Sequence, residues 1–440
     1  MSYLTDRRRF LKSTALTGVG VWVSTAAAAD SKSPNEKVRF GCIGVGGKGA
    51  SDSADAKRHG DVVAICDVDE NTLGKAAEKS FAHAAKFTDF RKLLEEQHKN
   101  IDVVTVSIPD HQHAAATAMA MRLGKACYTQ KPLTRTIFEA RRLGEIARET
   151  GVATQMGNQG TSFSPLRKTV AVVQAGVLGN VSQVHVWTDR PHWACGGPRP
   201  EPGTPPANLN WELWLGPAPY RPYAQGYHPH SWRGWWDFGS GALGDMACHT
   251  VNMPFMALDL RDPVAVQATS SGHNRDSFPK RAQITYEFPA NAKRPALTMT
   301  WYDGGNKPPA ELFEGHKVSD TGVLLIGDKG KLHAPGDYCE RLYTLFGGAV
   351  DKKVEFKQSP GHMRELTNAI QGGPPAVSNF PDYAGPLTET ILLGNLAVWA
   401  APEADTPGKR IEWDAKNLKP TNAPEVEVVV TPKYREGYVL

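Results

Sequence analysis

The sequence predicts an α/β protein: a doubly wound parallel sheet in its N-terminal part, followed by an α+β domain with an open, mainly antiparallel sheet. Two observations predict this fold class. From residue 37 to about residue 156, short apolar segments of strand length alternate with helical stretches, which is the pattern of a parallel sheet with crossover helices. After residue 260 a run of strand candidates follows instead.

The strands of the first part are apolar throughout, so helices are expected to cover both faces of their sheet. We expect strands at 38–43, 62–66, 103–108, 126–128 and 152–156, and helices at 49–58, 71–79, 89–97, 111–123 and 137–149. In the second part we expect strands at 181–188, 264–269, 282–288, 296–301, 323–326 and 354–356, with helices at 164–175, 241–258, 363–371 and 386–400. The predicted domains are residues 35–157 and 158–420, and a C-terminal tail spans 421–440.

The composition is that of a globular protein. With 440 residues, 40% of them hydrophobic and 22% charged, the chain is too long for one small module and too polar for a multi-span membrane protein. The net charge of +4 comes mostly from the first 29 residues, and no later basic cluster with interleaved aromatic residues indicates nucleic acid binding.

Residues 1–29 are expected to be an export signal. The segment Arg7-Arg8-Arg9-Phe10-Leu11-Lys12 precedes an apolar stretch too short to span a bilayer, and alanines fill positions 26–29. The pattern is similar to the bacterial twin-arginine (Tat) signal, a route for folded proteins. We therefore expect a periplasmic or otherwise exported mature protein.

Cysteine and histidine spacing predicts neither a disulfide framework nor a metal site. Cys42, Cys66 and Cys127 lie in apolar strands, as packed thiols do. The pairs His111/His113 and His228/His230 are of a kind that is common by chance.

Residues 191–236 form a long irregular segment rich in proline and tryptophan. Such segments are usually functional or disordered, and disordered ones contain few aromatic residues. Two interpretations stay open: tryptophans such as Trp235 stack on a sugar and seal a pocket, or they pack the loop onto the domain or a subunit interface.

The most specific functional signal is Gly44-Val45-Gly46-Gly47-Lys48-Gly49, a GxGxxG that directly follows a strand and opens a helix. Gly44 permits the tight turn, Gly46, beside Gly47, lets the backbone approach a pyrophosphate, and Gly49 allows close helix packing. Asp67 follows Gly49 by 18 residues, where a carboxylate can bind ribose hydroxyls and repel a 2′-phosphate. The first domain is therefore predicted to be a Rossmann domain that binds NAD rather than NADP.

Two further strand ends are expected to face the cofactor, because ligands of open parallel sheets bind beyond the carboxyl ends of the strands. Ser107, Pro109 and His113 follow one strand, and Gln130 and Lys131 follow the next. At this position the amine of Lys131 is well placed to meet the nicotinamide.

Asp245 and His249 lie four residues apart on an expected helix and therefore share a face. A histidine can remove a hydroxyl proton while a carboxylate orients it. The alternative is a core histidine beside a capping aspartate.

In this order and spacing, the glycine motif, Gln130-Lys131-Pro132 and the glycine-led Asp245/His249 pair resemble the Gfo/Idh/MocA family of sugar and cyclitol oxidoreductases, over about residues 37–400. The resemblance implies NAD(P)-dependent chemistry on a sugar or polyol hydroxyl, with Lys131 contacting substrate and cofactor, His249 as acid/base and Asp245 as its partner. The family's usual Glu-Lys-Pro is Gln-Lys-Pro here, which removes a negative charge and leaves open whether Lys131 or His249 accepts the proton.

Asn158, Gln159, Arg190 and Trp235 are weaker candidates for substrate contacts. The leading hypothesis is an NAD-dependent sugar dehydrogenase. An exported enzyme that released NADH would stall, so the alternative is a redox-neutral, NAD-dependent glycoside hydrolase or lyase with a captive cofactor. A third hypothesis is a binding protein without catalysis. A homo-oligomer is expected, because the open sheet leaves a face to cover.

Overall fold

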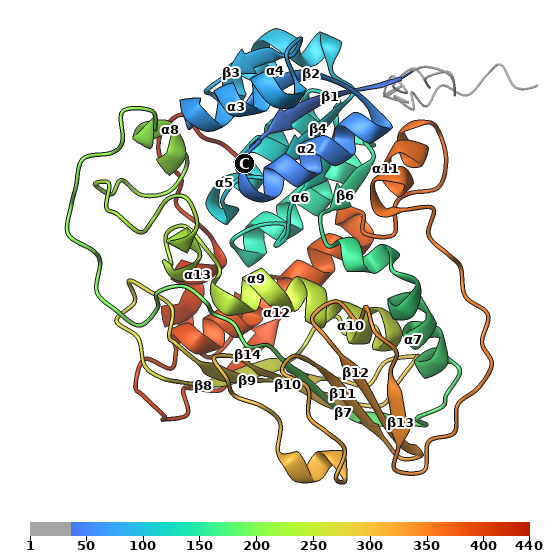
Figure 1. The fold of residues 1–440 in the computed structure, drawn as a ribbon. Coiled ribbons are helices and arrows are strands. Elements are labelled where there is room, and N and C mark those ends of the chain that lie inside the picture. The colour runs from blue at the N-terminus through green and yellow to red at the C-terminus, as the bar shows by residue number, and fades with distance from the viewer. Residues whose placement is uncertain (1–36) are drawn as a thin grey trace, which may run out of the picture. The chain divides into compact units, whose positions relative to one another are not determined.

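The structure, a computed structural model, describes residues 37–440, so the export signal predicted for residues 1–29 lies outside the described residues. The first domain is built on a six-stranded parallel sheet in the order β3-β2-β1-β4-β5-β6 (Figure 1). Its strands are β1 (Val38–Ile43), β2 (Gly60–Cys66), β3 (Ala85–Phe87), β4 (Val103–Val106), β5 (Ala126–Thr129) and β6 (Thr154–Met156). Its helices are α2 (Gly47–His59), α3 (Glu70–Ser80), α4 (Phe90–Gln97), α5 (Asp110–Arg122) and α6 (Ile137–Thr150).

The order of this sheet creates the binding crevice. From β1 the chain proceeds outward through β2 to β3, then returns to the other side of β1 with β4. The connection that follows β1 runs to one side of the sheet and the connection that follows β4 runs to the other. Between them a crevice opens at the carboxyl edge, where open α/β sheets bind their ligands. The doubly wound sheet predicted from the sequence is confirmed.

The second sheet has nine strands in the order β13-β12-β11-β7-β10-β9-β8-β14-β15. Only β7 and β10 pair in parallel, and the other neighbours are antiparallel. Its strands are β7 (Val181–Trp187), β8 (Ala265–Ser270), β9 (Ala282–Phe288), β10 (Leu297–Tyr302), β11 (Gly322–Gly327), β12 (Gly330–Pro335), β13 (Thr344–Phe346), β14 (Ile411–Asp414) and β15 (Lys419–Pro420). The predicted mainly antiparallel sheet is confirmed.

The remaining helices all follow β6 in the chain. They are α7 (Ser164–Gln174), α8 (Trp211–Leu215), α9 (Gly241–Thr250), α10 (Asn252–Leu258), α11 (His362–Ile370), α12 (Gly385–Trp399) and α13 (Glu427–Val430). Helix α12 is buried on nearly every side and packs on α6, on α9 and on strands β8 and β9 (Figure 1). Helix α9 packs beside α12, and its Asp245 side chain contacts Lys131 of the first domain.

Three local expectations were wrong. Residues 354–356 form no strand, and the edge of the sheet is made by β13, ten residues earlier. The helix expected over 241–258 is two helices that meet at Val251, before Pro254, which has no backbone N–H for a continuous helix. The strands β3, β13, β14 and β15 were not predicted, since strands of two to four residues carry little periodicity. The six-residue β12 was also missed, because it begins at Gly330 and ends at Pro335, residue types that favour turns.

Among the described residues, no helix is both long enough and apolar enough to cross a membrane.

Candidate active site

The glycine turn between β1 and α2 is shaped for close approach of a ligand. Gly44 has φ 81°, and a Cβ there would lie 2.3 Å from the Ser107 carbonyl oxygen. A Cβ on Gly49 would lie 2.2 Å from the Gly44 carbonyl oxygen. Both positions therefore require glycine, and the backbone amides at the start of α2 stay open to an anion. This cradle fits a dinucleotide pyrophosphate.

Asp67, directly after β2, is fixed by backbone amides. Its Oδ2 accepts a hydrogen bond from Val45 N and its Oδ1 one from Asp69 N, both at 3.1 Å. Burial raises the pKa of Asp67, and these backbone hydrogen bonds partly offset the effect. The carboxylate thus stands beside the glycine turn, where it can accept hydrogen bonds from ribose hydroxyls.

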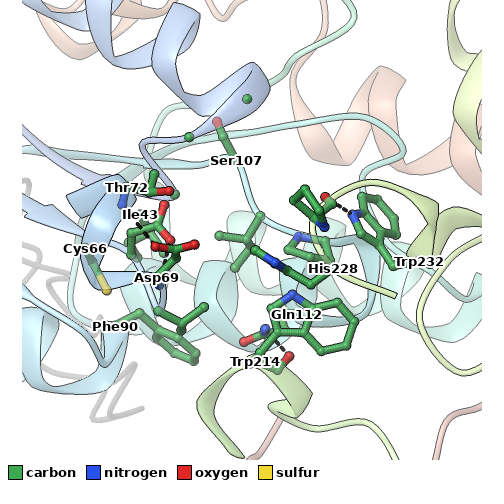
Figure 2. A pocket seen from close by; sticks show the side chains of 18 of the residues that line it. Ile43, Cys66, Asp69, Thr72, Phe90, Ser107, Gln112, Trp214, His228 and Trp232 are labelled. Carbon is green, nitrogen blue, oxygen red and sulfur yellow. Dashed lines mark hydrogen bonds between the residues drawn. The ribbon is translucent and has the colours of Figure 1, made fainter. Parts of the chain in front are cut away.

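A cavity of about 380 Å³ runs along this edge of the sheet. Its walls include eight residues predicted to bind the cofactor: Gly44, Gly46, Gly47, Asp67, Ser107, Pro109, Gln130 and Lys131. Figure 2 shows Asp69, Thr72 and Phe90 on one side, facing Trp214, His228 and Trp232 on the other. Two predicted contacts do not line it: Gly49 packs beneath the turn, and the His113 ring contacts the carbonyl oxygens of Ile108 and Pro132 at 2.7 and 2.8 Å.

A carboxylate that sequence reasoning missed ties the cofactor-facing segments together. Asp52, on α2, is only 3% exposed. Its Oδ2 accepts hydrogen bonds from Ser107 Oγ and Gln130 Nε2, both at 2.8 Å, and its Oδ1 accepts one from Lys48 Nζ at 2.5 Å. The signal available in the sequence was an aspartate on the helix that follows the glycine motif.

Lys131 and Asp245 are brought together across the crevice, although 114 residues separate them in the chain. Lys131 Nζ donates to Asp245 Oδ1 at 2.8 Å and also to the Asp245 carbonyl oxygen. Arg233 Nε, which sequence reasoning missed, donates to the same Oδ1 at 3.2 Å. Burial alone would raise the pKa of Asp245, but the charges of Lys131 and Arg233 hold it well below its usual range.

His249 lies one helical turn beyond Asp245 on α9 and is 3% exposed. Its Nδ1 is buried and has no hydrogen-bond partner. Burial, followed by the charge of Lys131, holds the pKa of His249 well below its usual value, while Asp245 opposes this effect. The ring of Tyr338, from the loop after β12, lies 4.4 Å from the imidazole, measured between centroids. His249 is therefore a neutral imidazole near neutral pH.

Asp110 is a second carboxyl group that was not predicted. It lines the cavity at the N-terminus of α5, and Ser240 Oγ donates to its Oδ2 at 2.6 Å. Burial raises the pKa of Asp110, while His113 and the Ser240 hydrogen bond lower it. Ser240 is the N-cap residue of α9, so this hydrogen bond connects the first domain to the helix that carries Asp245.

None of the four predicted substrate residues is among those that line the cavity. Asn158 is fully buried, with its Oδ1 accepting from Ser378 Oγ, and both Asn158 Nδ2 and Gln159 Oε1 are buried without a partner. Arg190 Nη1 donates to Asp189 at 2.7 Å. Trp235 packs edge-on against Tyr227, with ring centroids 5.2 Å apart. Their contact with substrate stays a prediction.

The tryptophan-rich loop packs its rings together and also lines the cavity, while stacking of a tryptophan on a sugar stays a prediction. Trp211, Trp214, Trp232 and Trp235 pack with Tyr227 in a hydrophobic cluster of their own. Trp214 and Trp232 also line the cavity. The loop is fastened directly behind Asp67, where Asn210 N donates to the Val68 carbonyl oxygen at 3.0 Å and Glu70 N to that of Asn208 at 2.9 Å. The loop therefore forms the wall opposite the glycine turn.

The rings of His111 and His113 contact backbone carbonyl oxygens, and those of His228 and His230 lie beside Trp214 and Trp193. The two ring nitrogens of His111 lie 3.1 Å from the Phe238 carbonyl oxygen and 2.9 Å from that of Trp214. Within residues 37–440, no group of three or more His, Cys, Asp or Glu side chains is arranged to hold a metal ion.

The fold and the cradle define an NAD-binding oxidoreductase architecture, and two family models agree with it. Residues 38–158 match the oxidoreductase family's NAD-binding Rossmann fold, and residues 159–296 match its C-terminal alpha/beta domain. The chain belongs to the Gfo/Idh/MocA family. The cofactor predicted from Gly44, Gly49 and Asp67 is thereby supported as NAD.

Individual relatives are distant. A glycosyl hydrolase family 109 protein of Solibacter usitatus is 32% identical over 153 residues, which is 31% of this chain and 34% of that protein. Levoglucosan dehydrogenase of Pseudarthrobacter phenanthrenivorans is 22% identical over 41% of this chain and 38% of its own. The chain thus matches only about a third of the length of these curated relatives.

Solved structures agree over a larger part of the chain. The WlbA dehydrogenase of Bordetella pertussis, crystallised with NADH and UDP-GlcNAcA, superposes with a TM-score of 0.58 at 16% identity. The match covers 85% of this chain and 98% of that one. At this identity the likeness establishes the shared fold.

Proposed function

We propose that this protein is an NAD-dependent oxidoreductase that transfers hydride between a carbon bearing a hydroxyl group, on a sugar, glycoside or polyol, and the nicotinamide. The observation that carries the proposal is the Lys131–Asp245 ion pair at the cavity wall, with the neutral His249 one helical turn away. Sugar and polyol dehydrogenases among the relatives support the substrate class.

The residues present fit the cofactor. The glycine turn would hold the pyrophosphate, Asp67 the adenosine ribose, and the Ser107–Pro109 and Gln130–Lys131 segments the nicotinamide half. When bound, NAD supplies the hydride acceptor or donor.

Two side chains, Lys131 and His249, act on the substrate hydroxyl group and its proton. Lys131 spends two of its three N–H donors on Asp245, so the remaining one can bind a substrate hydroxyl and orient it. A neutral imidazole is the better proton acceptor of the two, because the Lys131 amine already donates to the Asp245 carboxylate and carbonyl oxygen, whereas His249 Nδ1 has no hydrogen-bond partner. We therefore assign proton transfer to His249 and orientation to Lys131.

Asp245 and Arg233 keep this pair in place. Asp245 compensates the charge of Lys131, and Arg233 shares the same carboxylate oxygen from the tryptophan-rich loop. The Arg233 guanidinium also lies over the Trp232 ring, 4.2 Å from its centroid. The loop thus connects the reacting groups to the wall that limits access of water to the cavity.

The test is native mass spectrometry for retained NAD, followed by a panel of sugars, glycosides and polyols with NADH formation measured at 340 nm. We expect turnover with at least one of them, and a loss of at least a hundredfold in kcat for Lys131→Met and for His249→Ala. Unchanged turnover in both variants would overturn the proposal.

A redox-neutral glycoside hydrolase or lyase is the second candidate, favoured by the two relatives named as glycosyl hydrolase family 109 proteins. In such a cycle the substrate carbon is oxidised, the glycosidic bond is cleaved, and the carbon is reduced again by the same cofactor. Release of nitrophenol from a nitrophenyl glycoside by NAD-loaded protein, with no net change at 340 nm, would favour it over dehydrogenation.

We further propose export through the twin-arginine route, on the Arg7–Lys12 pattern, and association through the open sheet. Replacing Arg8 and Arg9 by lysine is expected to leave the protein in the cytoplasm, and multi-angle light scattering gives the mass of the assembly. A cytoplasmic wild-type protein, or a mass of one chain, would refute the respective proposal.

A further inference from the structure

Residues 431–440 cross from the second domain back to the cofactor crevice. Figure 1 shows the end of the chain, marked C, beside the helices of the first domain. Tyr438, near that end, lines the same cavity as Gly44 and Asp67. No function was expected of this segment from its sequence.

Tyr438 belongs to a particular part of the cavity. In the sheet order β3-β2-β1, the glycine turn follows β1, Asp67 follows β2, and Thr88–Phe90 follow β3. A dinucleotide with its pyrophosphate on the glycine turn and its adenosine ribose at Asp67 therefore directs its adenine toward the segment after β3. The Tyr438 ring lies against this third segment, with its centroid 6.4 Å from that of Phe90.

The tyrosine is held there by contacts from three elements. Tyr434 Oη donates to Glu139 Oε1 on α6 at 2.5 Å. Arg435 Nη2 donates to Glu212 on α8 at 2.9 Å, and Arg435 N donates to the Pro217 carbonyl oxygen at 3.1 Å. A turn then brings Tyr438 N to the Arg435 carbonyl oxygen at 3.3 Å, with Gly437 at φ 86°.

The ring itself is positioned by α4. The Arg91 guanidinium lies 4.7 Å from the ring centroid of Tyr438. That guanidinium is in turn fixed by three hydrogen bonds to Asp89: Nε donates to Oδ1 at 3.0 Å and to Oδ2 at 3.1 Å, and Nη2 donates to Oδ2 at 2.7 Å. An aromatic ring with a fixed orientation in the cavity wall is suited to the flat face of a base.

We propose that Tyr438 is the adenine-binding aromatic residue of the cofactor site, and that segment 431–440 is a strap that retains NAD in the crevice. The strap joins α6, the tryptophan-rich loop and α4, so the adenosine half can leave only if these contacts open. The proposal rests on NAD binding and not on the identity of the substrate.

Binding of cofactor fragments to the full chain tests the contact. Tyr438→Ala is expected to weaken NAD, ADP-ribose and AMP each by roughly tenfold in Kd, measured by calorimetry, and to leave nicotinamide mononucleotide unchanged. Tyr438→Phe keeps the ring and is expected to bind all four like the wild type. Val428→Ala, at a side chain that is 61% exposed on α13 and lies outside the strap, is the matched control. Equal affinities for AMP in the wild type and in Tyr438→Ala would overturn the proposal.

Hydrogen exchange of the unmodified protein gives a second measurement that needs no variant. Exchange in peptides covering 433–440 is expected to slow with NAD and with AMP, and not with nicotinamide mononucleotide. Exchange that is the same with and without AMP would overturn the strap. A wild type that binds no NAD would instead refute the proposed function, and one that binds NAD without turnover would refute only the chemistry.

Discussion

We expect the loss of Asp245 to lower the free energy of unfolding more than the loss of its ion-pair partner Lys131. In Asp245→Asn, both Lys131 and Arg233 lose their carboxylate, while each keeps a backbone acceptor. In Lys131→Met, Asp245 keeps the Arg233 hydrogen bond at 3.2 Å. Breaking a buried pair costs roughly 3–5 kcal/mol. Since the two side chains retain 15% and 13% exposure, we expect about 3 kcal/mol for Asp245→Asn and about 1–2 kcal/mol for Lys131→Met.

Thermal unfolding of the cofactor-free protein can resolve this order. An unfolding entropy of about 2.1 cal/mol/K per residue converts 3 kcal/mol into a fall of roughly 3 °C in Tm for a chain of this length. The double variant Lys131→Met/Asp245→Asn removes one of the two stranded cations, so its Tm should lie above that of Asp245→Asn. Its catalytic rate should remain at least about a hundredfold below that of the wild type, because a chemical group is missing whatever the stability.

Two results would refute this reasoning. If Lys131→Met lowers Tm as much as Asp245→Asn does, Arg233 does not share the carboxylate in solution. If any of the three variants keeps a rate within a few-fold of the wild type, the pair is structural and the reaction occurs elsewhere. A double-mutant cycle on the unfolding free energies of the wild type and the three variants gives the coupling energy of the pair.

Three further predictions follow from the same geometry. Because the pKa of His249 is lowered and its neutral form accepts the proton, kcat/KM for oxidation should stay level as the pH falls from 7.5 to 6, and decline only in more acidic solution; a midpoint near 6.5 would show an ordinary imidazole. Gly49→Ala should destabilise the protein by roughly 1–3 kcal/mol and weaken NAD binding, whereas Gly74→Ala, which meets no atom within 4 Å on α3, should leave the calorimetric Kd unchanged. Gln130→Glu should lower Tm and NAD affinity, and Asp52→Asn should restore both in the double variant; a Gln130→Glu protein as stable as the wild type would contradict this.

The parts of the molecule that a local pattern encodes were predictable. The glycine turn, Asp67 and the i,i+4 spacing of Asp245 and His249 are each contained in a short stretch of chain with a known geometry. The fold class followed from alternating strand and helix lengths. These features need no information about which distant segments meet.

The residues that were missed all act across long distances in the sequence. Arg233, Tyr338 and Tyr438 reach the site from loops, and no periodicity marks a loop residue that ends beside a crevice. Arg233 lies between Trp232 and Trp235, in a run where the tryptophans are the strongest sequence signal and a single arginine gives none. The unpredicted strands β14 and β15 have a different cause, since they contain four and two residues and are too short to show a clear alternation.

At Gln130, the local motif alone does not reveal the negative charge near Lys131, because a distant residue supplies it. By sequence, glutamine in place of the family's glutamate removes a carboxylate beside Lys131. In the structure, the Gln130 amide donates to the buried carboxylate of Asp52 at 2.8 Å, and Lys131 N donates to Gln130 Oε1 at 3.2 Å. A glutamate at position 130 would face Asp52 with an unpaired charge at that distance, which burial makes costly. The glutamine is therefore matched to Asp52, and the negative charge at the floor of the crevice is supplied by α2 instead of by the strand end.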